Sequence, residues 1–162
     1  QADPFSEISQ LGSAISFNIN GKKLIESSLK VHSDKVIPRE VKTQLKSGKL
    51  STKDMPRTRF YGLYQDYVCG AVLRIARELF ALLPIDIVIV TAIGQLLNTK
   101  TGHMDEEPVL SVIIPRDTQK KLNFEMLDPS DAMDNFIHNM RFLKTKGFRP
   151  VQKLLPSDIE KI

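Results

Sequence analysis

The longest periodic pattern of apolar side chains in this chain lies between Tyr61 and Leu83. Apolar residues recur there every three or four positions, which places them on one stripe of a helix. The stripe comprises Tyr64, Val68, Ala71, Val72, Ile75, Leu79 and Leu82. Pro84 should end the helix, because the residue before a proline is disfavoured in the α conformation. We therefore predict one long amphipathic helix over residues 61–83.

Apolar runs on both sides of this helix predict strands. Residues 85–92 are rich in Ile and Val, which is typical of a central strand buried on both faces. Residues 109–114 predict a second strand, and because no crossover helix separates the two, we expect them to be antiparallel. Upstream, alternating apolar residues lead into Asn20-Gly21, a dipeptide suited to a tight turn, so residues 14–31 should form a hairpin.

Turn and capping signals complete the predicted element order. Pro38 and Gly48 delimit a short polar helix. Alternation over residues 121–126 predicts a third, half-exposed strand. Asp128 is placed to cap a second helix that starts at Pro129 and closes near Gly147. Residues 148–154 predict a final strand at the edge of the sheet, because Pro150 cannot donate a ladder hydrogen bond.

These elements predict an α/β or α+β fold with a helix-strand-strand-strand-helix(-strand) core. We expect a mixed or antiparallel sheet covered by two helices. The sequence divides near Arg57 into a basic, hairpin-containing appendage over residues 1–56 and a core domain over residues 57–162. The chain begins at Gln1 rather than Met, which favours a fragment of a longer protein.

Composition is that of an ordinary soluble domain, with 41% hydrophobic and 26% charged residues. The longest apolar run, residues 81–93, contains Pro84 and Asp86 and is shorter than the roughly 20 residues a membrane span needs. Cys69 is the only cysteine, which suits a reducing compartment, so we expect a cytoplasmic protein that does not bind membranes. Within the helix, Cys69 should be a packed hydrophobe rather than a nucleophile.

Basic residues are unevenly distributed. Residues 22–59 contain 11 Lys or Arg and four Asp or Glu, a net charge of +7 within a chain of net charge +4. Such a segment favours an anionic partner such as nucleic acid, although it also fits a solubilising surface. The candidate contacts are Lys42, Lys46, Arg57 and Arg59. A second basic stretch, residues 141–153, contains five cations and no acid. We expect Tyr64 to be a core residue rather than a contact for nucleic acid, because it belongs to the buried stripe of the helix.

The sequence contains no phosphate-binding glycine loop, no paired-cysteine zinc motif and no nucleophile elbow. Their absence counts against the common NTPase, zinc and hydrolase classes. His103, Asp105 and Glu106 fall in one polar loop, where carboxylates could bind a divalent metal. Consecutive acids in a loop are more commonly solvated, so we expect no cofactor, with a divalent metal as the alternative.

The element order over residues 61–154 resembles the core of restriction-endonuclease-like nucleases. The resemblance implies a metal site in which Glu78 is the helical acid, Asp105 or Glu106 the second ligand and Glu125 the acid of the third strand. Glu125 is followed by Met126 and Leu127, where that family has a lysine. A shorter stretch of the order resembles a double-stranded RNA-binding domain, but residues 128–134 are acidic where that family is lysine-rich.

Three functions follow as hypotheses. The first is an accessory domain that binds nucleic acid or another polyanion and has no catalysis of its own, which the basic segments favour. The second is a protein-interaction or assembly domain, which the missing motifs favour. The third is a metal-dependent nuclease, which the element order and the acidic loop favour.

Overall fold

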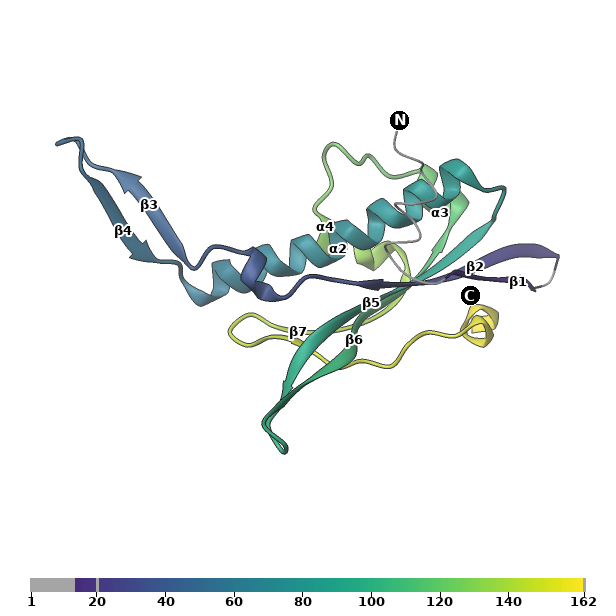
Figure 1. The fold of residues 1–162 in the computed structure, drawn as a ribbon. Coiled ribbons are helices and arrows are strands. Elements are labelled where there is room, and N and C mark those ends of the chain that lie inside the picture. The colour runs from purple at the N-terminus through teal and green to yellow at the C-terminus, as the bar shows by residue number, and fades with distance from the viewer. Residues whose placement is uncertain (1–13, 20, 162) are drawn as a thin grey trace.

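A computed structural model describes residues 14–19 and 21–161 and gives a mixed α/β fold, as the sequence predicts. A six-stranded sheet has the order β1-β2-β5-β6-β7-β8, and a separate two-stranded sheet projects from it (Figure 1). The strands of the large sheet are β1 (Ala14–Ile19), β2 (Lys22–Lys30), β5 (Ile87–Asn98), β6 (His103–Pro115), β7 (Ile137–Leu143) and β8 (Gly147–Arg149). Neighbouring strands are antiparallel except β2 and β5, which are parallel.

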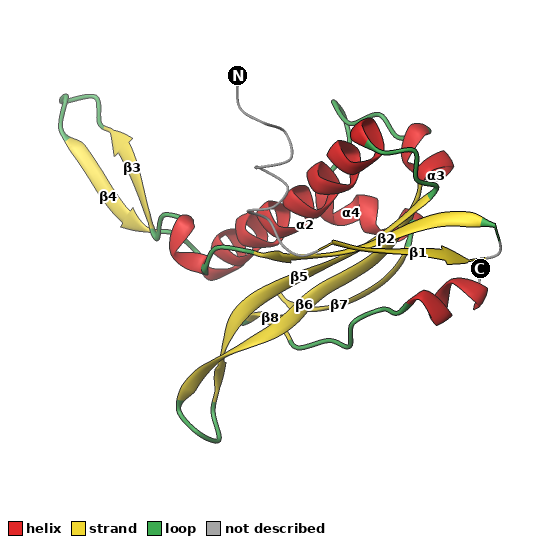
Figure 2. Cartoon of the chain, turned by 45° about the vertical axis from the view of Figure 1, so that its right-hand side comes forward, coloured by secondary structure: helices red, strands yellow, loops and turns green. Residues whose placement is uncertain are grey.

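One long helix, α2 (Arg57–Leu82), lies across one face of the large sheet (Figure 2). The predicted helix is confirmed, although it starts four residues earlier, and Leu83 before Pro84 is its C-cap. The remaining helical segments are short: η1 (Asp34–Val36), α3 (Arg116–Lys120), α4 (Pro129–Ala132), η2 (Met133–Asn135) and η3 (Pro156–Lys161). Among the described residues, no helix is long and apolar enough to cross a membrane.

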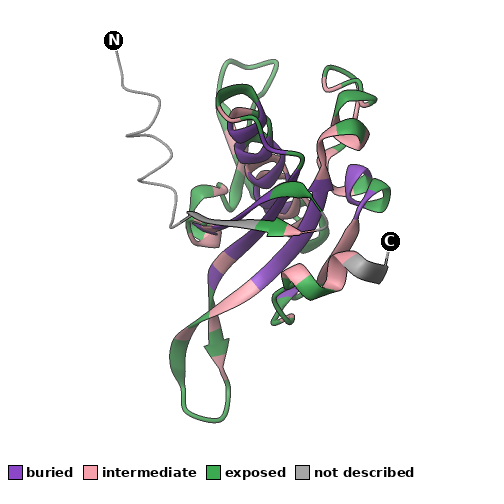
Figure 3. Cartoon of the chain, turned by 90° about the vertical axis from the view of Figure 1, so that its right-hand side faces the viewer, coloured by how far each residue is buried: buried purple, intermediate pink, exposed green. Residues whose placement is uncertain are grey.

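The main core lies between α2 and the sheet (Figure 3). Val68, Val72 and Ile75 of the predicted stripe are at most 5% exposed. They belong to one cluster with Val88 and Val90 of β5. The apolar periodicity therefore identified the buried face of the helix. Leu82, the last residue of the predicted stripe, is the exception, because it is 38% exposed at the end of α2.

Two further side chains of α2 are placed as the sequence predicts. Cys69 is fully buried, and burial raises the pKa of its thiol to about 12, so the sulfur stays protonated and packs as a small hydrophobe. Tyr64 is also in the core, and its hydroxyl donates to the backbone oxygen of His32 at 2.6 Å. Burial, followed by the negative charge of Asp34, raises the pKa of Tyr64 to about 12.

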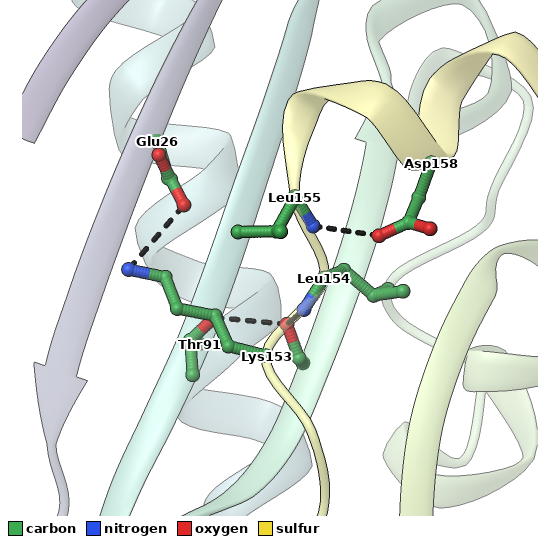
Figure 4. Close-up of polar contacts among 7 residues, drawn as sticks. Glu26, Thr91, Lys153, Leu154, Leu155 and Asp158 are labelled. Atoms are coloured by element: carbon green, nitrogen blue, oxygen red, sulfur yellow. Dashed lines mark hydrogen bonds and ion pairs between the residues drawn. The ribbon is translucent and has the colours of Figure 1, made fainter.

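The opposite face of the sheet is crossed by the C-terminal strap, which we define as residues 150–161. Leu154 packs there on a smaller apolar cluster that includes Ile89 and Ile113. Its backbone N–H donates to Ser111 Oγ at 2.9 Å, and Ser111 Oγ lies 2.8 Å from Thr91 Oγ1 (Figure 4). Because both hydroxyl residues are fully buried, these hydrogen bonds replace the water that the polar atoms have lost.

An ion pair between an exposed lysine and a buried carboxylate also attaches the strap to the sheet. Lys153 Nζ lies 3.3 Å from Glu26 Oε1, and the side chain of Glu26 is 9% exposed (Figure 4). A carboxylate buried to this extent requires a partner, because an unpaired charge away from water is strongly unfavourable.

The N-terminal half of the predicted sheet is confirmed. β1 and β2 form the antiparallel hairpin predicted for residues 14–31, and β5 pairs with β6 in antiparallel orientation. β5 lies between β2 and β6, so its run of Ile and Val is central as expected. The β2–β5 pairing joins residues on both sides of the predicted division at Arg57; whether residues 57–162 fold independently stays a prediction.

Two predicted elements after β6 are wrong. Residues 121–126, predicted as a strand, form turns, and Leu122, Phe124 and Leu127 pack on the core from this loop. The predicted helix from Pro129 stops at Ala132, although Asp128 caps it as expected by accepting from the N–H groups of Ser130 and Asp131 at 2.9 and 3.1 Å. The chain then enters β7, which takes the sheet position beside β6.

Two further segments differ from the prediction. Residues 38–48, predicted as a polar helix, lie largely in a hairpin of β3 (Glu40–Gln44) and β4 (Leu50–Asp54). Gly48, predicted as a helix stop, instead adopts a φ of +83° in the turn, where its N–H donates to Leu45 O at 2.9 Å. The predicted strand over residues 148–154 shortens to β8, which ends before Pro150.

Candidate nucleic-acid interface

The basic hairpin, which we define as residues 39–55, projects beyond the N-terminal end of α2 and away from the large sheet (Figure 1). It has five cations and two acids, and all seven of these residues are exposed. Its lysines are Lys42, Lys46, Lys49 and Lys53, and none of them forms an ion pair with another described residue. The hairpin therefore presents uncompensated positive charge to solvent.

A cationic cleft of about 640 Å³ lies where the basic hairpin meets α2 and the turn between β7 and β8. Four cations line the cleft, against the single carboxylate of Asp54: Arg39, Arg57, Lys146 and Arg149. Phe60 and Tyr61 of α2 also line it. The sheet order brings these residues together, because β8 lies at the edge of the sheet near the first turns of α2. Concentrated like charge of this kind favours an anionic ligand.

The first turn of α2 contributes to the same electrostatic field. Pro56 is the N-cap residue and makes no side-chain capping hydrogen bond, and no acid lies in the first turn. Helix N-termini carry a partial positive charge and free N–H groups, so acids are the residues that normally stabilise them. Arg57 and Arg59 instead add two cations there. This turn is suited to an external anion rather than to an internal cap.

Arg39 is held in a defined position at the base of the hairpin. Its guanidinium lies 4.5 Å from the ring centroid of Phe60, and its Nη2 lies 3.5 Å from Asp34 Oδ2. Its backbone oxygen accepts a hydrogen bond from Met55 N–H at 2.7 Å, which closes the hairpin. Fixing a guanidinium before a ligand arrives lowers the entropic cost of using it in binding.

The geometry of the cleft is the only guide to its ligand. No protein-family model, curated protein or solved structure to which the chain was compared gave a match. Chemically, the cleft and the hairpin offer guanidinium and ammonium donors, free helix N–H groups and the half-buried ring of Tyr61. Phosphate oxygens are the ligands that such donors bind most readily.

The four predicted contact residues divide between the two parts of this surface. Lys42 and Lys46 lie on the basic hairpin, and Arg57 lines the cleft. Arg59 is exposed in the first turn of α2 outside the lining of the cleft. Sequence reasoning did not single out Arg39, Lys146 or Arg149 as contacts. The five cations of residues 141–153 were a signal for Lys146 and Arg149 in the sequence. The position of these two residues beside α2, however, depends on the order of strands in the sheet.

The candidate catalytic acids are spread over α2, β6 and the turns after α3. Glu78 pairs with Arg74 Nε at 3.0 Å on the surface of α2. Asp105 accepts from Asn98 Nδ2 at 2.9 Å, and Glu106 lies 3.4 Å from Lys30 Nζ. Glu125 lies in the turns after α3.

The candidate metal ligands do not converge either. The polar loop predicted for these residues is wrong, because His103, Asp105 and Glu106 all lie on strand β6, which pairs with β5. His103 is exposed at the start of that strand. Adjacent residues of a strand point to opposite faces, which separates Asp105 from Glu106. Over residues 14–19 and 21–161, no three His, Cys, Asp or Glu side chains are grouped as a metal site. The described residues thus offer the nuclease hypothesis no metal centre.

Proposed function

We propose that this chain is an accessory domain that binds nucleic acid through the basic hairpin and the cationic cleft, without catalysis of its own. The observation that carries the proposal is the grouping of four cations with one carboxylate in a single cleft at the start of α2. This grouping costs folding free energy through charge repulsion, and the cations of Arg57 and Arg59 add a further cost at the N-terminus of α2. The negatively charged phosphates of a bound nucleic acid would remove both costs.

The hairpin extends this surface. Arg39 belongs to the hairpin and also lines the cleft, so phosphates held in the cleft would continue along the exposed lysines of β3 and β4. Each neutralised phosphate releases counterions, which strengthens binding at low salt. As for compartment, we keep the cytoplasm as the proposed location, on the basis of the single buried, unpaired Cys69.

The test is a fluorescence-anisotropy titration with a labelled oligonucleotide at several salt concentrations. The logarithm of affinity should fall linearly with the logarithm of salt concentration, by about 0.9 for each phosphate contact with duplex DNA or about 0.7 with a single strand. The double variant Lys146→Gln/Arg149→Gln should reduce that slope, because both residues line the cleft.

A matched control removes the same charge elsewhere. Lys120 and Lys121 are exposed beside α3, at the other end of α2 from the cleft (Figure 1). Lys120→Gln/Lys121→Gln should leave the slope nearly unchanged. Equal losses in both variants would mean that only net charge matters, and no binding at low salt would reject the proposal.

One observation favours a second candidate, protein interaction. Leu97 and Met104 are cross-strand partners near the end of the β5–β6 hairpin and are 58% and 56% exposed. Exposed apolar pairs of this kind are used in protein contacts. Leu97→Ser/Met104→Ser would test this candidate, since it should abolish any concentration-dependent self-association seen by analytical ultracentrifugation.

A further inference from the structure

We propose that the cationic cleft continues into a cleft that receives one unstacked base, so that the protein prefers single-stranded nucleic acid to duplex. This inference rests on the proposed function. The base cleft has a volume of about 430 Å³ and lies between α2, the segment that follows β2, and the β5–β6 hairpin. Tyr61 and Lys146 line both clefts, so the two adjoin.

Tyr61 stands at the junction in a fixed orientation. Its ring meets Phe60 edge-to-face, with centroids 5.1 Å apart and planes at 76°. The start of β8 also lies close against the ring, and a Cβ at Gly147 would come within 2.9 Å of Tyr61 Cδ1. Gly147 also adopts a φ of +82°, so glycine is required there for two reasons. The tyrosine ring is therefore preorganised and remains half-buried.

The far wall of the base cleft is also held in place. Tyr64 donates its hydroxyl hydrogen to His32 O at 2.6 Å, and His32 N–H donates to Tyr67 Oη at 3.4 Å. These bonds attach the segment after β2 to α2. Ser33 and Asp34, which follow directly, line the cleft.

The base cleft differs chemically from the cationic cleft. Leu96, Met104 and Phe148 give it apolar walls, and Ser33 and Asp34 add polar groups at one side. A nucleobase has the matching chemistry, with apolar ring faces and an edge of hydrogen-bond donors and acceptors. A carboxylate such as that of Asp34 can accept from an exocyclic amino group, although it also pairs with Arg39.

Only a strand with free bases can occupy both clefts. The phosphate group of a nucleotide would lie among Arg57, Lys146 and Arg149, and its base would pass Tyr61 into the base cleft. In a duplex the bases are paired and stacked inside the helix, so this placement would require a base to be flipped out. Single strands meet the requirement without that cost.

The experiment compares three labelled probes of about 12 nucleotides by anisotropy: a single strand, its duplex and an abasic strand with the same number of phosphates. The wild-type protein should bind the single strand more tightly than the other two. Tyr61→Leu should weaken single-strand binding about 5- to 150-fold, the range covered by base–aromatic stacking, and should bind the abasic strand as the wild type does. Tyr61→Phe keeps the ring and should bind like wild type.

Phe124→Leu is the matched control, because Phe124 contacts Arg77, 16 residues and roughly 24 Å along α2 from Tyr61. It should leave all three affinities unchanged. If the abasic strand binds as tightly as the normal strand to the wild type, the base cleft is refuted, while polyanion binding stands. If none of the probes binds, the proposed function fails as well. The wild-type comparison decides the matter even if Tyr61→Leu does not fold.

Discussion

The basic hairpin and the β1–β2 hairpin are both antiparallel strand pairs, yet they are stabilised in different ways. In β2, Leu24, Ile25 and Leu29 are at most 7% exposed, because the sheet is covered on both faces. In β3 and β4, no residue is buried. An isolated two-stranded hairpin is marginally stable in water, so the second hairpin depends on its base, where Arg39 contacts Phe60 and Met55.

The contrast shows that separate residues of this chain supply its apolar burial and its exposed charge. The sheet and α2 supply the apolar burial, while the hairpin carries charge that contributes little to folding. Residues of the cleft lie at the boundary between the two regions, since Phe60 is buried and Arg57 is exposed. Variants in the sheet and α2 should therefore lower the free energy of unfolding. Variants in the basic hairpin should weaken binding and leave the free energy of unfolding nearly unchanged.

The largest expected effect comes from the core. Ile75→Asp would place an unpaired carboxylate at a site that is 5% exposed, between α2 and the sheet. The desolvation of that charge should abolish cooperative folding. Thermal melting followed by circular dichroism measures the transition. Arg74→Gln is the adjacent control and removes only an exposed ion pair, so it should cost at most about 1 kcal/mol. A soluble Ile75→Asp protein with an unchanged Tm would contradict the packing of α2.

How much of this architecture the sequence could predict depends on the length of each pattern. α2 and β5 were predictable, because a stripe of seven apolar residues and a run of Ile and Val each fit one element type. The structure of residues 133–143 was not predictable. Met133, Phe136 and Met140 have helical spacing, although Ile137–Leu143 forms strand β7. The pairing of Ile137 with Ile113 decides the outcome, and that is a tertiary contact.

The candidate site was predictable only in part. Positive charge is readable from the sequence, and it identified the hairpin lysines and Arg57. The cleft, however, joins Arg39 and Arg57 with Arg149, which is more than 90 residues away in the chain. That proximity requires β8 to lie beside α2, and the predicted helix over residues 129–147 gave no such arrangement.

The buried hydroxyl of Ser111 holds the strap on the covered face of the sheet. Ser111→Ala should destabilise the protein by about 1–3 kcal/mol, because the Leu154 N–H and the Thr91 hydroxyl would both lose a buried partner. Thr91→Val should cost less, since Ser111 would still accept from Leu154. Denaturant midpoints measure both, and hydrogen exchange at the Leu154 amide should accelerate only in Ser111→Ala. Equal exchange in the two variants would mean that the hydroxyl does not hold the strap.

The smallest expected effect on stability comes from the basic hairpin and the start of α2. Lys42→Gln/Lys46→Gln/Arg57→Gln/Arg59→Gln removes four exposed cations. The free energy of unfolding should change by no more than about 0.5 kcal/mol, since exposed substitutions contribute little. Any change should be a small gain, because two of the cations oppose the dipole at the N-terminus of α2.

The same variant should lose much of the salt dependence of oligonucleotide binding, by up to about 0.9 in slope for each lost contact with duplex DNA. Urea denaturation and anisotropy titration on one preparation measure both quantities. Loss of binding together with a large loss of stability would show that the hairpin cations are structural. Retention of both the slope and the stability would place the anionic ligand elsewhere on the surface. Only the combination of unchanged stability and a flattened slope fits a surface whose charges serve binding rather than folding.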